Sequence, residues 1–415
     1  MEYLIFIAAG GLNFFKMISS IRAEYNRAFT PEKYDAFLAD VNQLHPGVLQ
    51  FRISETPVFI PADFKHRLIE AGEEVLGILE QPDFQKRTRS AIPPGRYVPG
   101  QNDRPEFIAL DFAVCLDGRG SPTPRLIGLR GFPTINALQP VLASSYQKHF
   151  RIPEGFSPYL NGYDENTYWD LLADLILAGH NPREVILLET EPDRQKARID
   201  FFLTQDKLGV EPVSVRELEK AGRKLYYRKG KQKIRVRRIY NRLAFDDLGS
   251  RGKAARRPAA IARHRMDVEW VSHPNWFFRV SKFLLPLMDS PYVPQAYFLH
   301  KLEVIPAHLE DYVLRPLFSS AGRGVTGGLS RAGLEGIPDP HRWILQKKVD
   351  YAPIVETPNG GAGCEIRLMY YWTKGAPRPV LAQNLCRLGS AGLPAASYNG
   401  SSGWTGTGIC FFEQG

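Results

Sequence analysis

Apolar residues recur at helical spacing along residues 17–95. Pro31 directly follows Thr30, an order that predicts a helix beginning at Pro31 with Thr30 as its N-cap. Residues 62–80 show the same spacing, as expected for a helix with one buried face. The pattern therefore predicts a helical N-terminal layer, which we assign to residues 1–95.

Short runs typical of β-strands begin near residue 105. Residues 107–114 and 125–130 flank the turn sequence Asp117-Gly-Arg-Gly, so we expect a β-hairpin there. Helices are predicted next, at residues 136–148 and 167–178. This part of the chain therefore mixes strands and helices.

A strand–helix–strand rhythm follows, with a strand at residues 184–189, a helix at 195–208 and a strand from residue 209. Such units form parallel sheets, which bind ligands at the carboxyl ends of their strands. We assign residues 96–300 to a central α/β region that could hold a substrate, and residues 301–415 to a third region.

The net charge of +9 on 415 residues is concentrated in one stretch. Residues 223–265 contain sixteen Lys or Arg and two Asp, a net charge of +14, so the rest of the chain carries −5. Residues 230–240 alternate basic with apolar side chains, as a strand with one wet face does, and residues 251–265 are typical of a solvated linker. A basic face around an anionic ligand is the favoured interpretation, ahead of an inert solvated surface and of nucleic-acid binding.

The composition, 44% apolar and 12% aromatic, allows a large core and excludes a wholly disordered chain. No two cysteines have the spacing of a zinc or redox motif, so we expect reduced, buried thiols in a cytoplasmic protein. The apolar run at residues 1–16 is too short to span a bilayer and follows no basic residue. We interpret it as a start-site extension and expect no membrane segment.

The segment from Tyr312 to Val325 runs from an apolar strand into a glycine-rich turn. Glycines let backbone N–H groups approach phosphate oxygens, serines add donors, and arginines supply positive charge. A glycine-rich hairpin turn without a ligand is the alternative. The candidate phosphate-binding residues are Arg315, Ser319, Ser320, Gly322, Arg323, Gly324 and Val325.

Two further strands are predicted downstream. Residues 343–351 begin apolar and become polar at Gln346, as expected where a strand edge leads into a linker beside an adenine ring. In the next strand, Glu365 and Arg367 lie on one face, where they can serve a metal ion and a phosphate, or pair with each other. The candidate adenine contacts are Gln346, Lys347 and Val349.

Together, residues 315–325, 344–349 and 365–367 resemble the nucleotide-binding half of ATP-grasp enzymes, and most of all the circularly permuted type that includes the glutathionylspermidine synthetase group. The resemblance implies an α/β (α+β) ATP-grasp fold in which the metal-site segment precedes the glycine turn. It further implies ATP and Mg²⁺ as ligands, and metal ligands on the strands at residues 107–112 and 124–130.

Asp111 fits the first metal position, and Glu365 is a second candidate ligand. On the second strand, Gly128 and Arg130 stand where the family pattern has Glu and an amide, which removes two oxygen ligands and adds a positive charge. Arg315 stands where the family usually has Lys, and it retains the charge.

The predicted function is an ATP-dependent ligase that phosphorylates a carboxylate and passes the acyl group to an amine or thiol, with Arg367 as the catalytic residue stabilising the transferred phosphoryl group. The alternative is a catalytically weakened ATP-binding module with a sensing or scaffolding role. The expected substrate is an anionic small molecule or peptide. Its candidate contacts are Arg238, Asn241, Arg242, Arg387 and Asn399.

Overall fold

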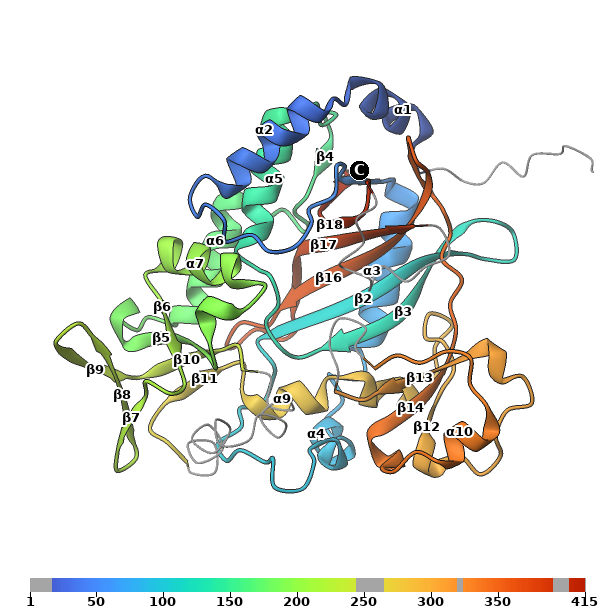
Figure 1. The fold of residues 1–415 in the computed structure, drawn as a ribbon. Coiled ribbons are helices and arrows are strands. Elements are labelled where there is room, and N and C mark those ends of the chain that lie inside the picture. The colour runs from blue at the N-terminus through green and yellow to red at the C-terminus, as the bar shows by residue number, and fades with distance from the viewer. Residues whose placement is uncertain (1–16, 244–264, 319–323, 391–402, 415) are drawn as a thin grey trace, which may run out of the picture.

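The computed structural model describes residues 17–243, 265–318, 324–390 and 403–414. Its largest sheet has six strands, in the order β18-β17-β16-β2-β3 with β15 paired to β16 (Figure 1). The strands are β2 (Phe107–Leu116), β3 (Pro122–Arg130), β15 (Val355–Thr357), β16 (Gly360–Tyr371), β17 (Val380–Ser390) and β18 (Gly406–Gly408). The predicted hairpin is confirmed, because β2 and β3 are antiparallel neighbours.

Alternation along β2 gives the large sheet two different faces. Ile108, Leu110 and Phe112 belong to the same buried core cluster as Phe64 and Leu68 of helix α3 (Ala62–Leu76). The intervening residues of β2 point to the opposite face, so one face of the sheet is apolar and covered by α3. The other face carries the candidate site.

A second sheet of four parallel strands has the order β11-β10-β5-β6. It comprises β5 (Val185–Glu189), β6 (Glu211–Ser214), β10 (Arg238–Asn241) and β11 (Glu269–Val271), and α7 (Arg198–Leu208) connects β5 to β6. The predicted strand–helix–strand unit is therefore confirmed. Helices α5 (Leu138–His149) and α6 (Glu165–Leu177) match the two predicted helices, and α9 (Pro274–Arg279) follows β11.

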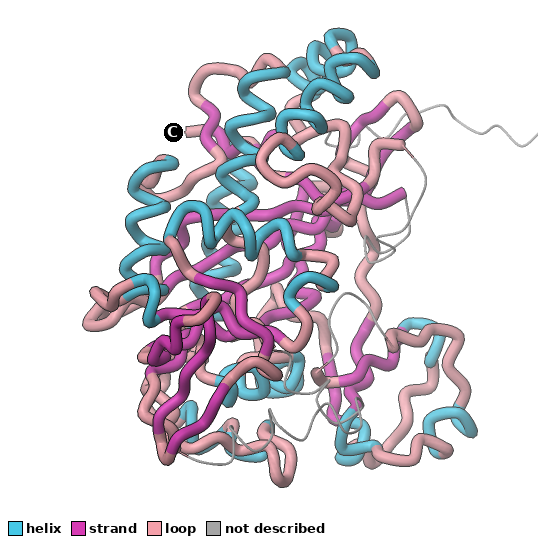
Figure 2. Tube along the Cα trace, turned by 60° about the vertical axis from the view of Figure 1, so that its left-hand side comes forward, coloured by secondary structure: helices cyan, strands magenta, loops and turns pink. Residues whose placement is uncertain are grey.

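The central and C-terminal regions also contain two small antiparallel sheets of three strands each. The sheet β12-β14-β13 consists of β12 (Ala296–Phe298), β13 (Tyr312–Pro316) and β14 (Trp343–Lys347), with helix α10 (Arg331–Glu335) between β13 and β14. Together with its loops it forms a lobe at the lower right of both views (Figures 1 and 2). The other sheet, β7-β8-β9, contains β7 (Glu219–Ala221), β8 (Lys224–Lys229) and β9 (Gln232–Val236).

The N-terminal region contains α1 (Ser19–Ala28), α2 (Pro31–Asn42), β1 (Val58–Ile60), α3 and α4 (Phe84–Arg87). Thr30 caps α2 as predicted, since its side chain accepts a hydrogen bond from the Lys33 N–H. This region is not helical throughout, however. Strand β1 pairs with β19 (Cys410–Glu413) from the far end of the chain, and β19 also pairs with β4 (Phe156–Ser157).

Among the described residues, no helix combines the length and the apolar character that crossing a membrane would require.

Candidate functional site

A buried ion-pair network lies on the face of the large sheet opposite α3, centred on Asp111. Asp111 on β2 and Arg367 on β16 are direct cross-strand partners. The Arg367 Nε donates to Asp111 Oδ1 at 2.5 Å and its Nη2 to Oδ2 at 3.0 Å, while Arg130 Nη2 donates to Oδ2 at 2.9 Å. The side chains of Asp111 and Arg367 are 6% and 3% exposed, so two guanidinium groups hold one buried carboxylate.

These contacts set the charge state of Asp111. Burial by itself would raise the pKa of the carboxyl, but the nearby Arg367 and Arg130 outweigh burial and hold the pKa well below its usual range. Burial together with the neighbouring Arg367 lowers the pKa of Arg387 to about 10, so this guanidinium is also charged at neutral pH. Asp111 and Arg387 are therefore both charged at neutral pH.

Glu365 forms a second centre of the same network. It faces Arg387 across β16 and β17, and Arg387 Nη1 donates to Glu365 Oε2 at 3.3 Å. The Tyr351 hydroxyl donates to Glu365 Oε1 at 2.7 Å. Glu365 and Arg367 are two residues apart on β16, so both carboxylates and their arginines share one face of the sheet. Nothing in the sequence pattern pointed to Tyr351.

Arg315 connects the small lobe to this network. It lies on β13, and its Nη1 donates to the Ile127 carbonyl of β3 and to Gln346 Oε1 of β14, both at 2.5 Å. Burial lowers the pKa of Arg315, while Tyr351, Glu365 and Asp111 counteract that effect. We refer to Arg130, Arg315, Arg367 and Arg387, with Asp111 and Glu365, as the arginine cluster. Its four guanidinium groups and two carboxylates carry a formal charge of +2.

Within the part of the chain that the structure describes, Arg315 Nε in the arginine cluster and Gln346 Nε2 next to it are buried without a hydrogen-bond partner. Buried N–H donors without an acceptor are rare in folded proteins because each costs the full desolvation of the group. Both belong to residues predicted to contact the nucleotide. Unused donors and a net positive charge are features that suit an anionic ligand.

The residues implied as a magnesium site do not fit Mg²⁺. Both oxygens of Asp111 are already bound by arginine, and its neighbour on β3 is Gly128, which offers no oxygen from a side chain. Within the part of the chain that the structure describes, no group of three or more His, Cys, Asp or Glu residues is placed to hold a metal. Asp111 and Glu365 bind arginines here, and the positive charge of the site comes from the protein itself.

The glycine turn is described only from residue 324 onward. Gly324 has φ of +74°, a backbone conformation that suits glycine, and Leu314 pairs with Thr326, so the chain returns to β13 after the turn. Val325 is 39% exposed. The candidates Ser319, Ser320, Gly322 and Arg323 lie outside the described residues, as does Asn399.

At the end of β14, Gln346 is buried, Lys347 is exposed and Val349 is half-buried. The Lys347 N–H already donates to the Gln295 carbonyl at 2.8 Å, and the Lys348 N–H to Asp311 at 2.7 Å. The adenine contact at this strand end stays a prediction.

The predicted substrate contacts on β10 and directly after it make hydrogen bonds within the protein. Arg238 donates to the carbonyls of Leu175 and Ile176 at the end of α6, and Asn241 donates to the Ser272 carbonyl at 3.2 Å. Arg242 pairs at 2.8 Å with Asp200, which is fully buried and accepts hydrogen bonds from the first N–H groups of α5. These contacts hold helices to the parallel sheet. A role in substrate binding gains no support from them.

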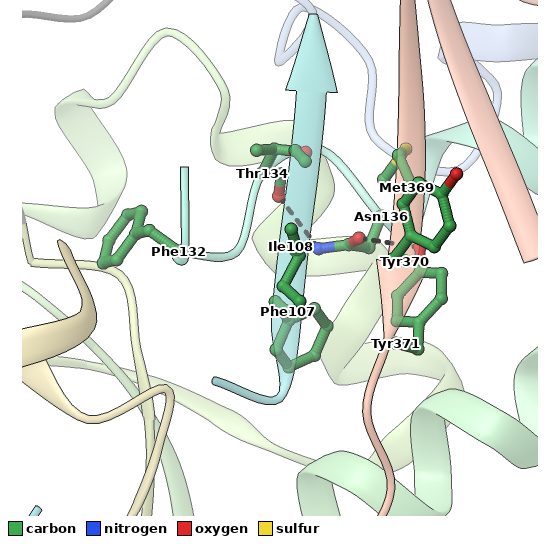
Figure 3. A pocket seen from close by; sticks show the side chains of 9 residues that line it. Phe107, Ile108, Phe132, Thr134, Asn136, Met369, Tyr370 and Tyr371 are labelled. Atoms are coloured by element: carbon green, nitrogen blue, oxygen red, sulfur yellow. Dashed lines mark hydrogen bonds between the residues drawn. The ribbon is translucent and has the colours of Figure 1, made fainter. Parts of the chain in front are cut away.

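A small hollow lies beyond the arginine cluster on the same face of the large sheet (Figure 3). It encloses about 160 Å³, open mouth included, and is therefore smaller than the roughly 300–1,000 Å³ of typical ligand pockets. Asn136 fills one side by donating to the Thr134 carbonyl at 3.2 Å and accepting from the Tyr371 hydroxyl at 3.0 Å. The hollow is too small for a nucleotide. Its lining is Phe107, Ile108, Ala109, Phe132, Thr134, Asn136, Met369, Tyr370 and Tyr371.

The fold is similar to that of a glutathione synthetase-like effector from Globodera pallida, solved in the apo form. The TM-score is 0.54 with 9% sequence identity, over 95% of this chain and 97% of that chain. At this identity the likeness shows the fold alone, a mixed α/β architecture with several sheets. No family model matches the sequence, and no curated protein matches it.

Proposed function

We propose that this chain is a catalytically weakened nucleotide-binding protein of ATP-grasp-like fold, in which arginines replace the metal ion. The observation that carries the proposal is the double arginine contact to Asp111. In active phosphoryl-transfer sites, metal ions bridge the phosphate oxygens and neutralise the charge that develops on them. Here the carboxylate that would hold the metal is already ion-paired with two protein cations.

The proposed ligand is ATP, bound with its phosphates at the arginine cluster and its adenine toward the end of β14. Guanidinium groups bind phosphate oxygens bidentately and stay charged at neutral pH. Arg315 and Gln346 each carry an unused buried donor beside the cluster, which a bound anion would satisfy. Arg315 lies on β13 of the lobe and donates a hydrogen bond to β3 of the large sheet, so a ligand bound to Arg315 would contact a residue that joins the lobe to the sheet.

Calorimetric titration of the protein with ATP, with and without Mg²⁺, tests this proposal. We expect binding that does not require Mg²⁺, because the cluster supplies its own cations, and a large loss of affinity in the Arg315→Ala variant. Lys301→Ala, an exposed cation of the same lobe, is the matched control and should bind like the wild type. No binding by the wild type in either buffer would overturn the proposal.

An ATP-dependent ligase is the second candidate, favoured by the coarse fold relation to a glutathione synthetase-like protein. In that case Arg367 would stabilise the transferred phosphoryl group, and a carboxylate substrate would form an acyl phosphate. Binding that appears only with Mg²⁺, together with ADP release in the presence of candidate carboxylates and amines, would favour this function over the first. The circular permutation and the identity of any acceptor stay predictions.

A further inference from the structure

The sheet β7-β8-β9 has one packed face and one open face. Leu225, Tyr227 and Val236 of the packed face are buried in the main core, and the Tyr227 hydroxyl donates to the Arg183 carbonyl at 2.9 Å. On the opposite face, Lys224, Arg228 and Lys233 are exposed, and Tyr226 and Arg235 are half-buried. The sheet lies at the lower left edge of the molecule, well away from the small lobe (Figure 1).

The open face is basic with an aromatic ring at its centre. Tyr226 on the middle strand lies between Arg235 of β9 and Glu219 of β7, and Arg228 lies opposite Lys233. Lys224 is on the same face, because it is two residues from Tyr226 along β8. We call Lys224, Tyr226, Arg228, Lys233 and Arg235 the basic face.

Carboxylates neutralise this region only in part. Residues 219–237 contain nine Lys or Arg and one acidic residue, Glu219. Glu219 pairs with both Arg228 and Lys233. No ion pair within the described residues engages Lys224 or Arg235, and Arg235 Nε is buried without a hydrogen-bond partner.

Tyr226 indicates what kind of anion fits. Its ring is half-buried, and the Lys233 Nζ lies 4.8 Å from the ring centroid. An aromatic ring surrounded by cations on a sheet surface can stack a nucleobase while the cations contact the flanking phosphates. A membrane-binding hairpin would instead present apolar side chains at its turns, and the turns here are Gly222-Arg223 and Gly230-Lys231.

We propose that the basic face binds single-stranded nucleic acid, with a base stacked on Tyr226 and phosphates bound by the four surrounding cations. This site is separate from the arginine cluster and does not depend on the proposed nucleotide-binding function. Single-stranded nucleic acid fits this face because its flat aromatic bases alternate with negatively charged phosphates. Sequence selectivity is not expected, because stacking and phosphate contacts read no base edges.

Fluorescence anisotropy of a labelled oligouridine, titrated with the full chain at several salt concentrations, tests the proposal. Each phosphate contact with a single strand contributes about −0.7 to the slope of log K against log salt, so four cations predict a slope of about −3. Lys224→Glu/Arg235→Glu should weaken binding at least about tenfold and reduce the slope by about 1.4. Tyr226→Leu should weaken binding about tenfold with the slope unchanged, because it removes stacking and no charge.

The matched control is Lys86→Glu/Arg87→Glu, which makes the same charge change at an exposed helix, α4, outside this sheet. It should bind the oligonucleotide like the wild type, and all variants should keep the wild-type melting temperature and ATP titration. The proposal is overturned if the control loses as much affinity as Lys224→Glu/Arg235→Glu, or if Tyr226→Leu binds normally. Tighter binding to phosphatidylserine vesicles or polyglutamate, with the same dependence on Lys224 and Arg235, would also overturn it.

Discussion

Replacing Asp111 by Asn tests whether this carboxylate is an internal ion-pair partner or a metal ligand. Asn keeps the shape of the side chain but removes its charge, which leaves the buried Arg367 and its neighbour Arg130 without their shared carboxylate. Removing one partner of a buried ion pair typically destabilises a protein by about 3–5 kcal/mol. We expect a loss of this size for Asp111→Asn in the complete absence of metal.

The pH dependence of this loss follows from the depressed pKa of Asp111. A carboxyl whose pKa is lower in the folded than in the unfolded state stabilises the fold at pH values above its unfolded pKa, about 3.9. That contribution disappears as the pH falls through the folded pKa. The difference between wild type and Asp111→Asn should therefore be constant from about pH 8 to pH 5 and shrink only under more acidic conditions.

Urea unfolding in EDTA, followed by circular dichroism, measures the effect. Asp350→Asn is the control, because Asp350 is exposed and its replacement should change the free energy of unfolding by less than about 0.5 kcal/mol. A metal ligand would behave differently, since Mg²⁺ would stabilise the wild type and not the variant. Such metal dependence, or a loss below about 1 kcal/mol for Asp111→Asn, would refute the assignment of Asp111 to an internal ion pair.

Two other substitutions test the site and its support. The double variant Gly128→Glu/Arg130→Gln adds a carboxylate beside Asp111 and removes a cation. The new side chain has room, because a Cβ at position 128 would lie 3.6 Å from Asp111 Oδ2, an ordinary van der Waals contact. Electron paramagnetic resonance should detect Mn²⁺ binding to this variant and none to the wild type. If the variant also fails to bind Mn²⁺, Gly128 and Arg130 are not the residues that exclude the metal. Gly72→Ala should destabilise the chain by about 1–3 kcal/mol, because the added Cβ would meet the Tyr370 hydroxyl. Adding Tyr370→Phe to Gly72→Ala removes that buried hydroxyl, which has no hydrogen-bond partner among the described residues, and should restore part of the lost melting temperature. A melting temperature that does not recover would contradict the proposed clash.

The sequence predicted the local elements of the fold because their signals are local. The alternation and the turn at Asp117 predicted the hairpin of β2 and β3, and apolar runs of strand and helix length predicted the parallel unit of β5, α7 and β6. Thr30 before Pro31 predicted the start of α2. In each case a few adjacent residues contain the whole pattern.

The sequence also predicted Asp111, Arg315, Glu365, Arg367 and Arg387 as site residues, and all five lie in the arginine cluster. That the cluster binds a ligand stays a prediction. The sequence marked Gly128 and Arg130 as departures from a metal-binding pattern. What it did not reveal is that Arg130 binds Asp111 directly. Tyr351 gave no signal at all, since its role depends on where its loop meets Glu365.

Only the tertiary structure decided how distant segments pair. Strand β16 lies beside β2, which brings Arg367 to Asp111 across 256 residues of sequence, and β1 pairs with β19 from the opposite end of the chain. Strand register is fixed by the packing of side chains that meet only after folding, and a shift of one residue would turn each charged side chain to the other face. The sequence by itself therefore determined the local elements and which charged residues were candidates for a site, and the pairing of the strands determined which charges meet.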